Sequence, residues 1–561
     1  MTMANAPSPR PALAALPVYK PGKSAEVAMK EHAIAEAIKL ASNENPYNPL
    51  PSVQEAADRG VFGSNRYPDH RATAVRERLA ARWGLTPDQV AVGCGSVGLL
   101  QQLLLTFVDA GQQVLYAWRT FESYPIYAQL VAAEIVTVPL RRQSLDLKAL
   151  AAAVTPATRM VLVTSPNNPT GTAVRSDHFA ALLDAVPEQC VVVLDEAYHE
   201  YITGHHVPDA LSFLPGHPNL VVLRTFSKAY GLAAMRIGYA MAHPDVIASV
   251  DKTLIPFAVN GVAQAAALAS LEPAADQELI ARVEGTLAER ERVAAEVRAL
   301  GLSVPDPQAN FVWLPAGESA AELTLTLEQL GVVTRPFPGE GVRVTIGSPA
   351  ENDRFLSVLA DAAGKLALTE TWLLPTGVGA ATVQRWVDRI DAAQSRLTLE
   401  SAREHDGLTE PDPGGTERWD AAQVWAHLAE FGGYWRDELD KVIAAESDDP
   451  VPFGRVKTDA RRIAGIEAGR ALPVSEHVAR ARFDLDVLRA EIAGWSTADW
   501  GRVGQHQTLG NMTIERQLDE FHVGHVEQHL DQLAGLAPPG WVGFHGTSRG
   551  RTQRAARSAR D

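Results

Sequence analysis

The sequence predicts an α/β domain with a mixed sheet, followed by a smaller α+β part and a C-terminal, all-α bundle of four helices. Short, β-branched apolar runs indicate the sheet, and four of them begin at Gln89, Arg159, Gln189 and Asn219. Their apolar residues are continuous rather than alternating. Strands with this pattern are covered by helices on both faces of a parallel or mixed sheet.

Two further patterns divide the rest of the chain. Strand-like residues return between Ala309 and Pro349, with a helical stretch between them, which indicates the smaller α+β part. From about Leu366 the strand pattern fades, and four stretches have the spacing of amphipathic helices: 378–401, 419–446, 474–494 and 513–536. Helices of this length, joined by turn-rich segments, are typical of a bundle. We therefore expect one domain at 1–365, a bundle at 376–536 and a disordered basic tail at 537–561.

Composition and charge restrict the partners of the chain. The sequence has 51 Lys and Arg against 67 Asp and Glu, a net charge of −16, which argues against nucleic-acid and anionic-membrane partners. Only Cys94 and Cys190 occur, which fits a reducing compartment. We find no signal peptide and no apolar stretch of membrane-spanning length, so we expect a cytoplasmic protein. An Arg-rich arm for nucleic acid is the alternative interpretation of the tail.

A lysine with anion-binding neighbours follows the last of the four runs, in RTFSKAYGLAAMRIGY. Lys228 is flanked by the hydroxyl groups of Thr225 and Ser227, and Arg236 lies further along the same motif. Two hydroxyl groups and a guanidinium group suit a phosphate dianion. An ordinary surface lysine is the alternative, but it would not explain this grouping.

Three further motifs also follow apolar runs, where ligands gather in open α/β sheets. Asp195 ends the run VVVLD, so it is expected to be a buried carboxylate that needs a cationic partner. Tyr198 follows it, and Asn168 lies in the turn motif TSPNNPTG; both side chains are hydrogen-bond donors. The segment Gly95-Ser96-Val97 opens a helix, whose first N–H groups bind anions. A lysine, a carboxylate for a pyridinium nitrogen, donors for a phenolic oxygen and a phosphate cradle together predict pyridoxal phosphate as cofactor.

These residues resemble the fold-type-I, pyridoxal-phosphate-dependent aminotransferases, and within them the branch of histidinol-phosphate and aromatic amino acid (phenylalanine) aminotransferases. The resemblance runs from about Leu16 to Ala362 and rests on motifs in the order of the family: LPVYKPGK, KLASNENPYNPLPSV, NRYPDH, GCGSVGLLQQL, SPNNPTG, DEAYHEY, the lysine motif, QANFVWLP and GVRVTIGSPAEND. It implies a mixed, seven-stranded sheet, a large domain at about 45–255 and a small domain at about 15–44 and 256–365.

The resemblance also implies further roles. Phe121 would stack on the cofactor ring, and Tyr67 would reach the cofactor phosphate of a neighbouring subunit, which implies a homodimer. Arg343 would hold the substrate carboxylate, because a guanidinium fork matches that group. Asn43 and Asn310 would line the substrate pocket.

The donor substrate remains open between two alternatives. Histidinol-phosphate members of the branch usually have an acidic pair after the cradle glycine, where this chain has Ser96-Val97-Gly98, as in the phenylalanine type. We therefore expect transfer of the amino group of an aromatic L-amino acid to 2-oxoglutarate. Arg335, however, lies where the family has a second arginine for a substrate anion, so histidinol-phosphate transamination in histidine synthesis is the alternative.

Histidines in the predicted bundle suggest a metal site. In TIERQLDEFHVGHVEQHLDQL, His525 and His529 are one helical turn apart on the apolar face, and His427 has a similar position in WDAAQVWAHLAEF. Ordinary core histidines are the alternative. The arrangement resembles the DinB-like bundle family, which includes thiol-cofactor-dependent transferases and isomerases, and it implies one divalent ion, zinc or nickel. A non-catalytic binding module is the other possibility for this part.

Overall fold

The computed structural model describes residues 22–363, 380–411, 418–445, 449–456 and 459–536, together with Arg10, Leu13 and Leu16. The predicted basic tail and the predicted domain boundary near 365–376 lie outside these residues. The chain forms two compact units, of which the first contains Met1–Asp388 and Asp486–Gly501 and the second Arg389–Leu485 and Arg502–Asp561.

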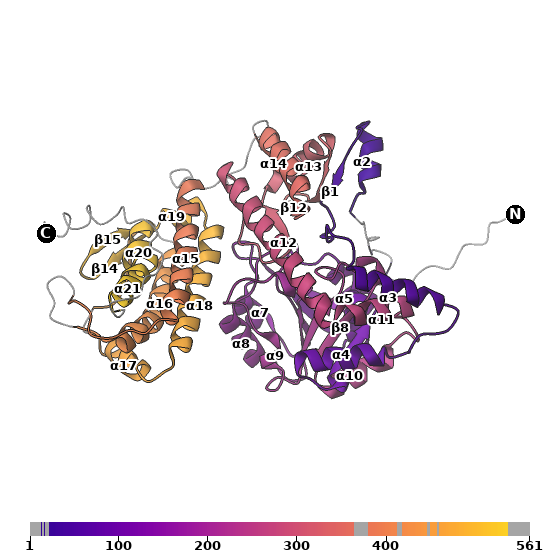
Figure 1. Ribbon diagram of the computed structural model, residues 1–561, viewed down its shortest axis with the longest axis horizontal. Coiled ribbons are helices and arrows are strands. Elements are labelled where there is room, and N and C mark those ends of the chain that lie inside the picture. Colours follow the sequence, from indigo (N-terminus) through magenta and orange to yellow (C-terminus); the bar gives the residue numbers. More distant parts are fainter. Residues whose placement is uncertain are drawn as a thin grey trace. The chain divides into compact units, whose positions relative to one another are not determined.

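A seven-stranded mixed sheet organises the first unit (Figure 1). The strand order is β2-β8-β7-β6-β5-β3-β4, and β8 runs opposite to the other six strands. The strands are β2 (Val90–Gly93), β3 (Gln113–Trp118), β4 (Glu134–Pro139), β5 (Thr158–Thr164), β6 (Val191–Asp195), β7 (Leu220–Thr225) and β8 (Gly238–Ala242). The predicted mixed sheet is confirmed, and the four apolar runs form β2, β5, β6 and β7.

Both faces of this sheet are buried. In β6, Val192 and Leu194 belong to one apolar cluster, while Val191 and Val193 belong to another on the opposite face. This explains why the runs are continuously apolar. The helices around the sheet are α3 (Pro51–Phe62), α4 (Thr73–Trp83), α5 (Gly95–Phe107), α6 (Ser123–Leu130), α7 (Leu147–Ala153), α8 (Ser176–Ala185), α9 (Ala210–Phe213), α10 (Pro244–Val250) and α11 (Gly261–Ser270).

A second, smaller sheet in the same unit has its own core. Its order is β11-β12-β9, all antiparallel, with β9 (Phe311–Leu314), β11 (Arg335–Phe337) and β12 (Gly341–Thr345). Leu323, Leu327, Phe355 and Leu359 pack in a core cluster separate from those of the large sheet. The other elements here are α2 (Ala25–His32), the parallel pair β1 (Ile38–Lys39) and β10 (Val332–Val333), α12 (Pro273–Ala299), α13 (Ala320–Gln329) and α14 (Pro349–Ala363).

The C-terminal region is mainly helical, as predicted, but it also contains a short sheet. Its helices are α15 (Ala380–Ser401), α16 (Ala421–Ala444), α17 (Ala460–Gly469), α18 (Val474–Gly494), α19 (Thr497–Trp500), α20 (Ile514–Phe521) and α21 (Val523–Gly535). The sheet has the order β13-β14-β15, formed by β13 (Val451–Phe453), β14 (Val503–His506) and β15 (Gly510–Thr513). These strands are too short to stand out in the sequence. No helix in the described part of the chain is long and apolar enough to cross a membrane.

The prediction of one continuous helix at 513–536 is wrong, because the chain bends between α20 and α21. His522 leaves the helical conformation, with φ −133° and ψ −102°. Gly524 permits the bend, since a Cβ atom at this position would collide with the main-chain oxygen of Asp519. His525 and His529 therefore both lie on α21, after the bend.

Candidate active site

A cavity lies at the carboxyl ends of β5, β6 and β7, beside the start of α5. This edge of the sheet is where ligands bind in open α/β folds. Most of the residues predicted from the motifs line it: Asn43, Ser96, Val97, Phe121, Asn168, Asp195, Tyr198, Thr225, Ser227, Lys228, Arg236, Arg335 and Arg343. The fold therefore brings together motifs that are far apart in the sequence.

Gly95, Tyr67 and Asn310 are the predicted residues of this unit that do not line the cavity. Gly95 has φ +74°, and a Cβ atom there would lie 2.6 Å from an Arg236 guanidinium nitrogen, so only glycine fits. Asn310 does not face the pocket as expected, because its buried amide group donates to the main-chain oxygen of Asn43 at 3.2 Å. Tyr67 is 82% exposed and stacks on Phe257.

Lys228 lies in the wall of the cavity. Its Nζ donates to the main-chain oxygen of Ser42 at 3.3 Å. Burial, reinforced by the positive charge of Arg343, lowers the pKa of Lys228 to about 7. Much more of this amine is therefore unprotonated near neutral pH than in an ordinary lysine, and a nucleophile or a general base must be unprotonated.

Asp195 is a buried carboxylate at the end of β6. Tyr124 donates to its Oδ2 at 3.1 Å, and the main-chain N–H of Ala197 donates to its Oδ1 at 3.2 Å. In the described part of the chain, no lysine, arginine or histidine forms an ion pair with Asp195, and burial raises its pKa to about 6. A buried carboxylate without a cation fits a ligand that supplies one, such as a protonated pyridine nitrogen.

Tyr124 was not predicted from the sequence. It is 0% exposed, and its hydroxyl group contacts Thr164 as well as Asp195. The available signal was its spacing from Phe121 in the segment FESY, since positions three apart in a helical turn share one side.

Most residues of the predicted anion cradle line the same cavity as Lys228. Thr225 Oγ1 donates to Ser227 Oγ at 2.9 Å, and Arg236 Nη1 donates to the same Ser227 oxygen at 3.4 Å. Ser96, in the first turn of α5, lines the cavity with them. Hydroxyl groups, a guanidinium group and a helix N-terminus fit the phosphate group of the predicted cofactor.

The remaining polar side chains form a connected network. Asn43 donates to the hydroxyl oxygen of Tyr198 at 2.9 Å. Arg343 donates to Asn168 Oδ1 and, at 2.8 Å, to the main-chain oxygen of Ala41. These two contacts hold the guanidinium group of Arg343 at the wall of the cavity.

Fold and site together define the class of protein: the chain belongs to the class I and II aminotransferase family, whose model matches residues 35–359. The chain is therefore an aminotransferase, and the family implies pyridoxal phosphate as the cofactor. An aromatic amino acid aminotransferase of Thermobifida fusca (strain YX) is 52% identical over 358 residues, covering 64% of this chain and 98% of the relative. One from Mycobacterium bovis (strain BCG / Pasteur 1173P2) is 49% identical, covering 62% and 96%.

Among solved structures, the fold resembles histidinol-phosphate aminotransferase from Sinorhizobium meliloti in complex with pyridoxal-5'-phosphate. The TM-score is 0.60 at 28% sequence identity, covering 65% of this chain and 100% of that chain. The likeness confirms the predicted fold type of the first unit.

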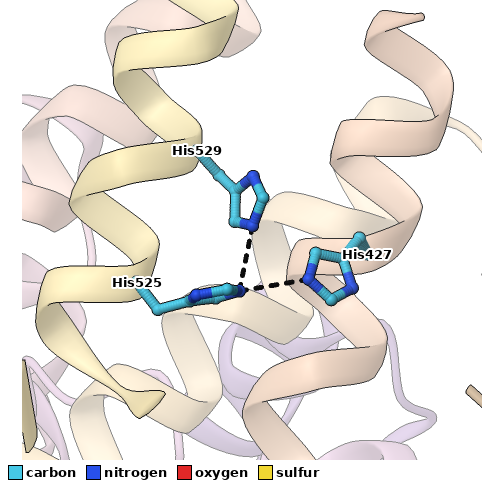
Figure 2. Close-up of side chains that lie close together, drawn as sticks. All are labelled: His427, His525 and His529. Carbon is cyan, nitrogen blue, oxygen red and sulfur yellow. Dashed lines mark hydrogen bonds between the residues drawn. The ribbon is translucent and has the colours of Figure 1, made fainter. Parts of the chain in front are cut away.

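The second unit contains a cluster of three imidazole rings (Figure 2). His525 Nε2 lies 3.1 Å from His427 Nε2 and 2.9 Å from His529 Nε2, so α16 and α21 direct three nitrogen atoms to one point. Burial and the neighbouring imidazoles lower the pKa values of His427 and His525 well below their usual range. Neutral imidazole is the form that binds a metal ion.

Proposed function

We propose that the first unit transfers the amino group of an aromatic L-amino acid, of the phenylalanine type, to 2-oxoglutarate. The identity of 52% with an aromatic amino acid aminotransferase, over nearly the full length of that relative, carries this proposal. The alternative donor is histidinol phosphate. It is favoured by the likeness to the Sinorhizobium enzyme and by Arg335 in the cavity wall.

The proposed roles of the side chains follow from their positions. Bound pyridoxal phosphate supplies an electron sink for charge that develops at the substrate α-carbon. Asp195 would hold the proton of the pyridine nitrogen, and Phe121 would pack against the ring. Tyr198 and Asn168 would hydrogen-bond the phenolic oxygen, and the phosphate group would be held by Gly95, Ser96, Val97, Thr225, Ser227 and Arg236.

Lys228 and Arg343 act on the substrate in this proposal. Arg343 pairs with the substrate carboxylate, and Asn43 helps to orient it. Lys228 would hold the cofactor through Nζ, and in the reaction the free Nζ amine would accept the proton of the substrate α-carbon. Its lowered pKa supports this role, because only the unprotonated amine is a base.

We further propose a homodimer in which Tyr67 reaches the cofactor phosphate of the neighbouring subunit. Tyr67 does not line the cavity of its own chain, and its exposed side chain leaves it accessible to another subunit.

The donor is tested with purified holoenzyme, 2-oxoglutarate and a panel of amino donors, with formation of the keto product as readout. We expect phenylalanine, or another aromatic amino acid, to have a kcat/KM above that of histidinol phosphate. A preference for histidinol phosphate of about tenfold, roughly 1.4 kcal/mol in transition-state stabilisation, would reverse the assignment.

For the second unit we propose a DinB-like bundle that binds one divalent ion, zinc or nickel, through His427, His525 and His529. The observation that supports it is the convergence of three imidazole nitrogens within 4.8 Å of one another. Three protein ligands leave coordination positions open, as in catalytic metal sites. The bundle then has one of two roles: it catalyses a thiol-dependent reaction at the ion, or it is a binding module without catalytic activity.

Metal content tests the ligand set. We expect about one ion per chain in protein purified with added metal, and near-zero metal in the double variant His525→Ala, His529→Ala. His506→Asn is the control: His506 is buried in the same unit but outside the cluster, and asparagine can accept the same hydrogen bonds. Equal metal in wild type and double variant would leave a core of ordinary histidines. Chelation should lower the melting temperature of the bundle without changing the cofactor spectrum.

A further inference from the structure

An ion pair that the aminotransferase chemistry does not require lies in the wall of the cavity. Glu122 Oε2 accepts a hydrogen bond from Arg335 Nη2 at 2.7 Å, and both side chains line the cavity that holds Lys228. Glu122 immediately precedes α6, next to Phe121. The side chain of Arg335 is 14% exposed and that of Glu122 is 34% exposed, so water screens the pair only in part.

The position of Arg335 explains why it needs a counter-charge. In the pairing of β11 with β12, Arg335 lies directly opposite Arg343. Residues opposite each other in an antiparallel pair extend on the same face, with Cβ atoms about 4.5–5.5 Å apart, and like charges there repel. Glu122 offsets one of the two positive charges in this part of the cavity wall.

We propose that Glu122 is a specificity-determining residue, because its carboxylate competes with any anionic group on the substrate side chain for Arg335. An aromatic side chain leaves the pair intact. A distal carboxylate or a phosphate group has to displace Glu122 before it can bind Arg335. This inference rests on the proposed function, in which Arg343 binds the α-carboxylate and Arg335 faces the rest of the substrate.

The chain offers a matched control next to this pair. Arg119 Nε donates to Glu340 at 2.8 Å, and this second ion pair also joins the segment before α6 to the β11–β12 hairpin. Neither Arg119 nor Glu340 lines the cavity. Loss of this pair loosens the same two segments without changing the charge that faces the substrate.

The test compares the holoenzyme's affinity for two unreactive acids by calorimetry: glutarate, with two carboxylates, and 3-phenylpropionate, with one carboxylate and a ring. In Glu122→Gln, we expect the affinity ratio of glutarate to 3-phenylpropionate to rise about fivefold, the upper end for an ion pair that water partly screens. The ratio should stay at the wild-type value in Glu340→Gln. In the double variant Glu122→Gln, Arg335→Met the gain should disappear.

Two outcomes would overturn the proposal: a ratio in Glu122→Gln that equals the wild-type ratio, or an equal rise in Glu340→Gln, which would indicate loosening rather than charge. Glu122→Asp keeps the charge but shortens the side chain. In this variant we expect the affinity ratio to lie between those of the wild type and Glu122→Gln. The affinity ratios of the Glu122 variants are independent of the donor panel, because that panel measures kcat/KM of the wild-type enzyme alone. A wild-type preference for histidinol phosphate would refute the proposed donor and leave the effect of Glu122 measurable.

Discussion

Lys228→Ala should abolish transamination and the visible absorption band of the lysine-bound cofactor. Alanine has no amine to bond the cofactor or to accept a proton from the substrate α-carbon, and no other lysine lines the cavity in the described part of the chain. Steady-state formation of the keto product and the absorption spectrum after loading with pyridoxal phosphate measure the two effects.

An exposed lysine provides the control for this substitution. Lys252 lies away from the cavity, so Lys252→Ala should keep both the band and the turnover. A Lys228→Ala protein that remains active and keeps the band would refute the assignment of the whole site, because every other role is defined relative to this amine.

Asp195→Asn should lower kcat by several orders of magnitude. A neutral amide cannot stabilise the protonated pyridine nitrogen, so the cofactor would lose its strength as an electron sink. Tyr124→Phe, which removes only one hydrogen bond to Asp195, should cause a much smaller loss. Turnover near the wild-type rate in Asp195→Asn would remove this residue from its proposed role.

The melting temperature of the cofactor-free variant distinguishes this chemical effect from damage to the fold. Burial raises the pKa of Asp195 to about 6 in the cofactor-free protein, above the usual value of a carboxyl group. The carboxyl group ionises in the unfolded chain at about pH 4 but in the fold only at about 6, so its contribution to stability falls as pH rises through this range and stays low above it. At pH 7 the cofactor-free Asp195→Asn variant should melt no lower than the wild type in calorimetry. A much lower melting temperature would mean that the loss of activity reflects damage to the fold.

The sequence by itself predicted four of the seven strands of the large sheet and most of the residues that line the cavity. Continuous apolar runs marked β2, β5, β6 and β7, because a strand with two buried faces needs apolar residues at every position. Asp195 and Lys228 could be predicted because each lies close behind such a run, at the edge of the sheet where ligands bind. The turn spacing of His525 and His529 is likewise a local property of one helix.

The tertiary structure alone decided which distant side chains meet. Tyr124 reaches Asp195 and Glu122 reaches Arg335 across long stretches of sequence, and nothing in the local pattern of either residue specifies its partner. The bend at His522 depends on the close approach of Gly524 to the backbone of Asp519, which the helical spacing of the apolar residues does not reveal. The spacing of apolar residues indicates which face of a helix or strand is buried. The charge balance of the cavity depends on contacts between elements, and only the packed fold creates them.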